Sequence, residues 1–148
     1  MHQLRNKLSI RDPLLIASSV GCAALWIALG VAKMLGPGPF REFIADTTGF
    51  PDSVAAVAAW LVILGEVGLG LSILLGLLQG RMAIPSTTSL IASLLVLGYL
   101  VLLADPGETC GCFGGVLEAN WARRTIVAGI LTLLSSWTCT RQLSTNRS

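Results

Sequence analysis

The sequence predicts an all-α integral membrane protein, an antiparallel four-helix bundle with both termini in the cytoplasm. Three observations support this prediction. Hydrophobic residues make up 53% of the 148 residues and charged residues only 12%, about half of the ~25% usual in soluble domains. The mean hydropathy is +0.76, and the apolar residues fall into four long runs. This composition excludes a disordered segment, a nucleic-acid-binding module and an ordinary soluble enzyme.

The first two predicted spans are the clearest. A helix needs ~20 mostly apolar residues to cross ~30 Å of hydrocarbon. We expect a helix at about residues 13–35, because Pro13 suits a first helical position and an apolar run follows it. We expect a second at about residues 53–79, with Asp52 before it as a cap.

The other two runs match a membrane-spanning helix to different degrees. The third is predicted at about residues 84–104, a run that contains no charge. The fourth, at about residues 121–140, is weaker because it must include Arg123 and Arg124 in its first turn, from where both can reach the lipid headgroups. The connections leave no room for a further domain, so residues 1–148 are predicted to form one transmembrane domain.

The orientation follows from the basic residues, which favour the cytoplasmic side of a membrane. The predicted topology puts six of them on the side of the termini and four on the opposite side. The terminal side is therefore predicted to be cytoplasmic, in a bacterial inner membrane, and the first and third connections face the periplasm or exterior. The six are Arg5, Lys7, Arg11, Arg81, Arg141 and Arg147.

Two rows of small residues, each spaced four apart, lie on single helix faces. Such rows let helices approach closely in lipid. Packing within the bundle is one interpretation, and a homodimer seam is the other. The rows are Ala24, Ala28, Ala32 and Gly36 in the first span, and Gly68, Ser72, Gly76 and Gly80 in the second.

The third connection carries Cys110 and Cys112, the main candidates for chemistry. On the predicted topology they lie where a disulfide can form. The ring that it closes is small, so it would stabilise the fold little. Unless Gly111 bends the chain its geometry is strained, and strained disulfides are oxidising and labile. The positive end of the fourth helix follows, which favours the thiolate form. We expect a redox pair.

Two other interpretations of the pair stay open, a static staple and a metal site. The metal site lacks a third ligand because His2, the one histidine, is assigned to the opposite side, so we expect no metal. Cys22 and Cys139 are expected to be reduced and buried in the inner half of the bundle, where they pack as small apolar residues.

Glu66 is the one acidic residue deep within a predicted span, and an ionisable group there is a functional candidate. In one interpretation it pairs with Lys33 or Arg124 and fixes the bundle. In the other it handles protons or contacts a headgroup such as a quinone. Glu66 lies ~20 Å from the start of its helix. Pairing therefore requires that this helix begins above the membrane, or that the basic side chains reach inward.

A family resemblance rests on residues spread along the chain, over about residues 14–139. The order resembles that of the MauE family, methylamine-utilisation membrane proteins grouped with DoxX-like redox-associated proteins. In chain order the residues are Gly30 and Lys33, Pro39 and Phe40, Glu66, the Cys-Gly-Cys-Phe-Gly sequence of residues 110–114, and Trp121 with Arg124.

The resemblance implies a helper role in maturing methylamine dehydrogenase, whose small subunit carries many disulfides. Cys110 and Cys112 would exchange disulfides with a periplasmic thioredoxin-like protein. Lys33, Glu66 and Arg124 would form a polar centre in the outer half of the bundle.

The predicted function is thus thiol–disulfide exchange that supports periplasmic cysteine maturation, with a quinone near Glu66 as the hypothetical electron acceptor. The alternative is a non-enzymatic DoxX-like anchor or scaffold subunit of a periplasmic redox complex. A third interpretation is a carrier of a small molecule or metal. The sequence leaves open whether the protein is an enzyme. The expected partners are the lipid bilayer, the thioredoxin-like protein and the dehydrogenase small subunit.

Overall fold

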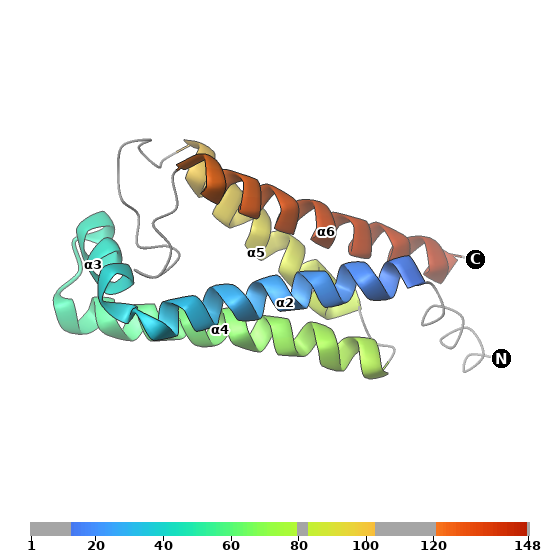
Figure 1. The fold of residues 1–148 in the computed structure, drawn as a ribbon, viewed down its shortest axis with the longest axis horizontal. Coiled ribbons are helices and arrows are strands. Elements are labelled where there is room, and N and C mark those ends of the chain that lie inside the picture. The colour runs from blue at the N-terminus through green and yellow to red at the C-terminus, as the bar shows by residue number, and fades with distance from the viewer. Residues whose placement is uncertain (1–12, 80–82, 103–120, 148) are drawn as a thin grey trace.

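The computed structural model describes residues 13–79, 83–102 and 121–147, and every regular element in these ranges is a helix (Figure 1). One helix more is present than the sequence predicts, because the first connection contains a helix of its own. The elements are α2 (Pro13–Leu35), α3 (Pro37–Thr48), α4 (Asp52–Gln79), α5 (Ala83–Leu102) and α6 (Trp121–Arg147). The last of them continues beyond Thr140, where the sequence prediction ended it.

The unpredicted helix α3 has clear local signals at both ends. Pro37 occupies its first turn, where a missing N–H costs nothing. Gly49 follows its end with a φ of 68°, and its N–H donates to the carbonyl of Ala45 at 2.8 Å. Glycine adopts this left-handed conformation without strain and so stops a helix. This segment was predicted only as the first connection, but proline at the first helical position favours a helix.

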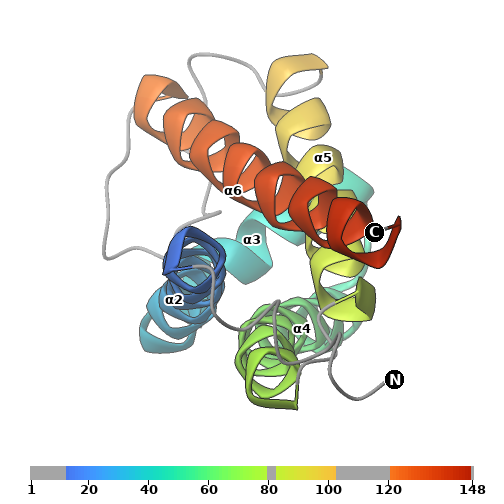
Figure 2. The same ribbon diagram turned by 90° about the vertical axis from the view of Figure 1, so that its right-hand side faces the viewer.

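The long helices form two antiparallel pairs, α2 with α4 and α5 with α6, and α6 also packs against α2 (Figures 1 and 2). α3 lies across one end, called here the α3 end. α2 and α5 finish toward this end, and α4 and α6 begin there (Figure 1). The start of α2 and the finish of α6 lie at the opposite end.

Two glycines set the close approach of α2 and α4. A Cβ atom at Gly30 would lie 2.6 Å from a methyl group of Val67, and one at Gly70 would lie 2.8 Å from the carbonyl oxygen of Ala23. Neither glycine belongs to the predicted rows of small residues. In those rows Ala24 and Ala28 are exposed, whereas Gly76 is buried.

Two clusters of buried apolar side chains lie between the helices. The larger one joins α2, α4 and α6 through Trp26, Ile73 and Leu131, among others. The smaller one lies at the α3 end, where Phe40 of α3 packs against Ala59 and Ile63 of α4. α3 is therefore held against the first half of α4 by the same kind of packing as the long helices.

The outer surface is unusually apolar. Large side chains such as Leu78, Ile84 and Leu133 are 72–81% exposed. A soluble monomer rarely shows so much apolar surface. α2 and α4 are long and apolar enough to cross a membrane, and α5 contains a shorter apolar stretch, Ile84–Gly98.

Candidate functional site

The centre of the candidate site is an ion pair between Lys33 and Glu66. Nζ of Lys33 donates a hydrogen bond to Oε1 of Glu66. Both side chains are buried, with 6% and 10% of their surfaces exposed. A charged group in such surroundings needs an opposite charge, because desolvation alone would be very costly. Lys33 is one of the two partners that the sequence suggested for Glu66.

The relative lengths of α2 and α4 explain how this pair forms. Lys33 lies in the last turn of α2, whereas Glu66 lies at the middle of α4. The first half of α4 extends past the end of α2, and Phe40 of α3 packs against Ala59 and Ile63 there. This extension of α4 beyond the end of α2 brings the middle of α4 beside the last turn of α2.

Phe40 covers the ion pair from α3. Nζ of Lys33 lies 5.0 Å from the centroid of the Phe40 ring, a distance at which a cation is attracted to the ring face. The Phe40 ring itself is buried and stacks on Phe43, with centroids 6.5 Å apart. No role for Phe40 was predicted from the sequence beyond its place in the family resemblance. Its signal was the apolar spacing of Phe40, Phe43 and Ile44 after a helix-starting proline.

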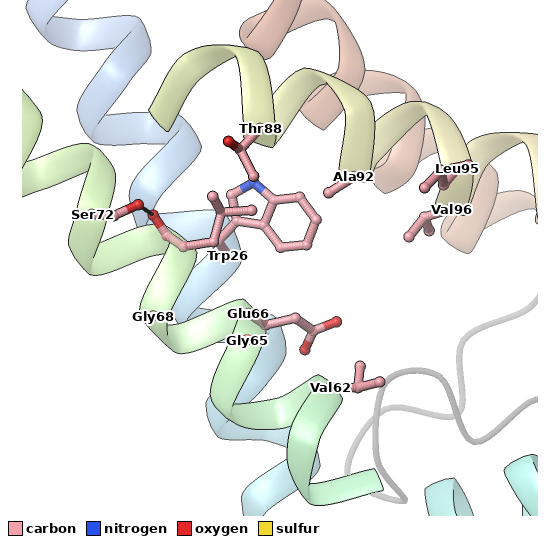
Figure 3. A pocket seen from close by; sticks show the side chains of 11 residues that line it. Trp26, Val62, Gly65, Glu66, Gly68, Ser72, Thr88, Ala92, Leu95 and Val96 are labelled. Carbon is pink, nitrogen blue, oxygen red and sulfur yellow. Dashed lines mark hydrogen bonds between the residues drawn. The ribbon is translucent and has the colours of Figure 1, made fainter. Parts of the chain in front are cut away.

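The second carboxylate oxygen of Glu66, Oε2, has a different environment. It is buried and has no hydrogen-bond partner among the described residues. A cavity of about 560 Å³ opens beside Glu66, between α4 and α5, with Trp26 of α2 at its base. Figure 3 shows the Glu66 carboxyl group directed into this space. The site therefore combines a neutralised ion pair with one free acceptor facing a cavity.

The cavity is otherwise mostly apolar. Gly65, Gly68 and Leu69 line it from α4, and Ala92 and Leu95 line it from α5 (Figure 3). The cavity is wide open on one side, and it joins apolar walls to a few polar groups, as small-molecule sites typically do. Gly68 belongs to a row predicted to pack helices together, yet it lies beside open space.

A separate polar network lies deeper, where α2, α5 and α6 meet. Ser89 Oγ accepts a hydrogen bond from Nε1 of Trp26 at 2.8 Å and lies 2.8 Å from Ser135 Oγ. Cys22 Sγ lies 3.3 Å from Ser89 and 3.4 Å from Ser135. Cys22 is free and buried, but it takes part in this network and is more than an apolar filler.

The sequence contains a signal for this network, although the network was not predicted. Ser86, Ser89 and Ser93 recur at helical spacing along α5, and all three are buried. Ser135 of α6 is likewise fully buried. A polar stripe on an apolar helix indicates a face that packs against protein, because lipid offers no hydrogen-bond partner.

The remaining predicted site residues are not brought into this arrangement by the described part of the structure. Cys110 and Cys112 lie outside the described residues, and so does the side chain of Arg124. Cys139 is free and only half-buried, 3.9 Å from Thr87. The described residues contain no cluster of three metal-binding side chains.

A model of a known protein family matches most of the chain. The family model described as methylamine utilisation protein MauE matches residues 11–141. The match includes α2 to α5, most of α6, the ion pair and the cavity. No curated protein and no solved structure matches the chain.

Proposed function

Because this chain belongs to the MauE family of methylamine utilisation proteins, we propose that it is a helper in disulfide formation at the bacterial inner membrane. Family and apolar helices together make it a membrane protein linked to methylamine utilisation. The proposal adds a redox pair, Cys110 and Cys112, and a client, the disulfide-rich small subunit of methylamine dehydrogenase. A periplasmic thioredoxin-like protein would connect the two.

The observation that carries this proposal is the position of the two helix ends that flank the cysteine-bearing connection. α5 finishes and α6 begins toward the α3 end (Figure 1), so the two described residues that flank the connection, Leu102 and Trp121, lie on that side. Lys33 also lies near this end, in the last turn of α2. The start of α2 and the finish of α6 lie at the opposite end.

Charge supports an orientation with the α3 end outside. The opposite end contains the finish of α6, where Arg141 lies over the ring of Trp137 at 4.7 Å. Arginine and tryptophan together are typical of the membrane interface, and basic residues favour the cytoplasmic side. In the proposed topology four helices cross the bilayer, both termini are cytoplasmic, and α3 lies on the periplasmic side.

The proposed chemistry is a two-electron exchange without a cofactor. A thiolate of the partner attacks one sulfur of the Cys110–Cys112 disulfide and expels the other as a thiolate. The second thiol of the partner, deprotonated, then attacks the mixed disulfide. The partner leaves with a new disulfide, and Cys110 and Cys112 remain as the reduced pair. Electrons and protons balance, because one disulfide is consumed for each one made.

Trapping tests this proposal directly. In Cys110→Ser and Cys112→Ser variants the remaining thiol can attack the disulfide of the oxidised partner, which is the reverse of the proposed step. Acid quenching followed by alkylation blocks the partner's second thiol before it resolves the complex, so a mixed disulfide should be captured in at least one of the two variants. Non-reducing gels and mass spectrometry would identify the partner. Cys139→Ser is the matched control, since it removes a free, half-buried thiol from α6 and should trap nothing.

The contrary result also has a defined meaning. If both loop variants insert normally, trap no partner and leave the disulfides of co-expressed periplasmic proteins unchanged, the exchange mechanism is wrong. The non-enzymatic anchor or scaffold role would then be favoured. Orientation is checked separately: a membrane-impermeant maleimide on intact, reduced cells should label Cys110 and Cys112.

A further inference from the structure

We propose that the cavity between α4 and α5 binds the ring of a lipid-soluble hydroquinone, whose hydroxyl group donates a hydrogen bond to Oε2 of Glu66. The observation that motivates this is the buried, unpartnered Oε2 beside a cavity of about 560 Å³. An orphaned buried acceptor is costly, so a ligand that supplies the donor would be stabilised there. The inference concerns the helical bundle and goes beyond the exchange proposed for the cysteines.

The described polar groups that line the cavity have already used their donors. Trp26 Nε1 donates to Ser89. The hydroxyl groups of Ser72 and Thr88 donate to carbonyl groups of their own helices, at 2.8 and 2.9 Å. What the walls still offer are acceptors, and the charged Oε2 of Glu66 is the strongest of them. A ligand that fits must therefore bring an O–H or N–H group.

The charge of the site selects a neutral ligand. Lys33 already neutralises Glu66, so a cation in the cavity would add an uncompensated positive charge to a mostly apolar environment. Burying such a charge is strongly unfavourable. A small ammonium ion is thus a poor ligand, whereas a neutral phenolic hydroxyl group satisfies the acceptor without adding charge.

The shape of the cavity suits a flat ring with an apolar tail. Gly65 and Gly68 present no side chain, and a Cβ atom at either would meet nothing within 4 Å. The indole of Trp26 forms the facing surface at the base (Figure 3). Val62 and Leu95, at the rim, are 42% and 70% exposed. The cavity therefore opens onto the apolar outer surface, where a hydrocarbon tail would lie among lipids.

The oxidised form of the same ligand is expected to bind less well. A quinone carries carbonyl oxygens in place of hydroxyl groups, so it offers only acceptors to a site whose open groups are acceptors. A carbonyl oxygen facing the Glu66 carboxylate would be repelled. Tighter binding of the hydroquinone than of the quinone would therefore distinguish binding at this site from simple partitioning into lipid, which would not show this preference.

A link to the cysteine pair follows, and this step alone rests on the proposed function. The proposed exchange leaves Cys110 and Cys112 as a reduced pair of thiols, and a quinone would reoxidise this pair. Two thiols would lose two electrons and two protons, one disulfide would form, and the quinone would become the hydroquinone that the cavity holds. The acceptor is then a component of the membrane itself.

The test measures binding of decylubiquinol and decylubiquinone to the full-length protein in nanodiscs, under anaerobic conditions, against empty nanodiscs. We expect decylubiquinol to bind at least about tenfold more tightly than decylubiquinone, the scale of one hydrogen bond to a charged acceptor. Gly68→Leu should fill the cavity and weaken decylubiquinol binding by about tenfold or more. Ala92→Leu should do the same from the α5 wall.

Gly129→Leu is the matched control, because Gly129 also lies within a helix, beside open space, but does not line the cavity. It should bind decylubiquinol like the wild type. A Cys110→Ser/Cys112→Ser variant should also bind it normally, so failure of the exchange mechanism does not affect this result. Equal binding of the two probes, equal effects of the Gly68 and Gly129 variants, or displacement of the probe by methylammonium would each overturn the proposal.

Discussion

Lys33, near the end of α2, and Glu66, at the middle of α4, neutralise each other inside the bundle although 33 residues separate them in the sequence. Phe40 of α3 covers the lysine side of the pair, and the cavity opens on the glutamate side. One charge pair thus joins three helices and forms one wall of a cavity.

Removing either member of this pair should destabilise the protein far more than removing both. Lys33→Met leaves a buried carboxylate unpaired, and Glu66→Gln leaves a buried ammonium group. Each should lower the free energy of unfolding by about 3–5 kcal/mol. The Lys33→Met/Glu66→Gln double variant should recover most of that loss. Unfolding in mixed micelles, followed by circular dichroism, measures the three values.

Arg141→Met is the control for a basic residue outside the pair. Arg141 is exposed and lies over Trp137, so its loss should cost no more than about 1 kcal/mol. If Lys33→Met cost no more than Arg141→Met, the ion pair would not be a stabilising element.

The contact between Phe40 and the lysine should be measurable as a coupling energy. Phe40→Leu removes the ring under Nζ of Lys33, and it should cost about 0.5–2 kcal/mol more than Phe43→Leu. Phe43 is the reference because it packs against the same cluster. In a Lys33→Met background the difference between the two leucine variants should shrink by this coupling energy, leaving only the difference in packing. A difference that is unchanged there would assign the effect to packing alone.

The glycines between α2 and α4 should tolerate no side chain. Gly30→Ala and Gly70→Ala each place a methyl group within 3 Å of the neighbouring helix, and each should cost about 1–3 kcal/mol. Gly129→Ala meets nothing within 4 Å, so it should be neutral or stabilising by about 0.5–1 kcal/mol through helix propensity. Thermal unfolding in one detergent compares the three, and equal midpoints would contradict the close approach.

Two buried serines of α5 should differ sharply in their importance. Ser89→Ala takes the acceptor from Trp26 and a partner from Ser135, which should cost about 1–3 kcal/mol. Ser93 donates to a carbonyl group of its own helix, so Ser93→Ala takes no bond from another helix and should cost no more than about 1 kcal/mol. Trp26 fluorescence gives a local readout, which should change in the first variant only. Matching spectra would argue against the network.

The environment of Glu66 could be predicted only in part from the sequence. An acidic residue inside an apolar run is visible in the sequence, and Lys33 is one of only two partners proposed for it. Which partner it contacts depends on how far α4 extends past α2, and that depends on α3. The segment that forms α3 was predicted to be a connection. Proline and glycine occur both in connections and at helix boundaries, and which of the two applies depends on what the residues between them pack against.

The packing faces were harder to predict for a physical reason. In a soluble protein the apolar stripe of a helix marks its buried face. In α2 and α4 apolar side chains occur on the exposed faces as well as the buried ones, so the stripe carries no such information. The row of Ala24 and Ala28 therefore gave the same signal as Gly30, yet only Gly30 lies against α4.

The sequence by itself determined the helical class, the membrane character, the approximate positions of the long helices and the family. These follow from hydropathy and residue order, which are local properties of the chain. The tertiary structure alone decided that Lys33 contacts Glu66, that Cys22 joins Ser89 and Ser135, and that a cavity opens beside a free carboxylate oxygen. These depend on the register and separation of helices, which small residues and polar contacts set in three dimensions.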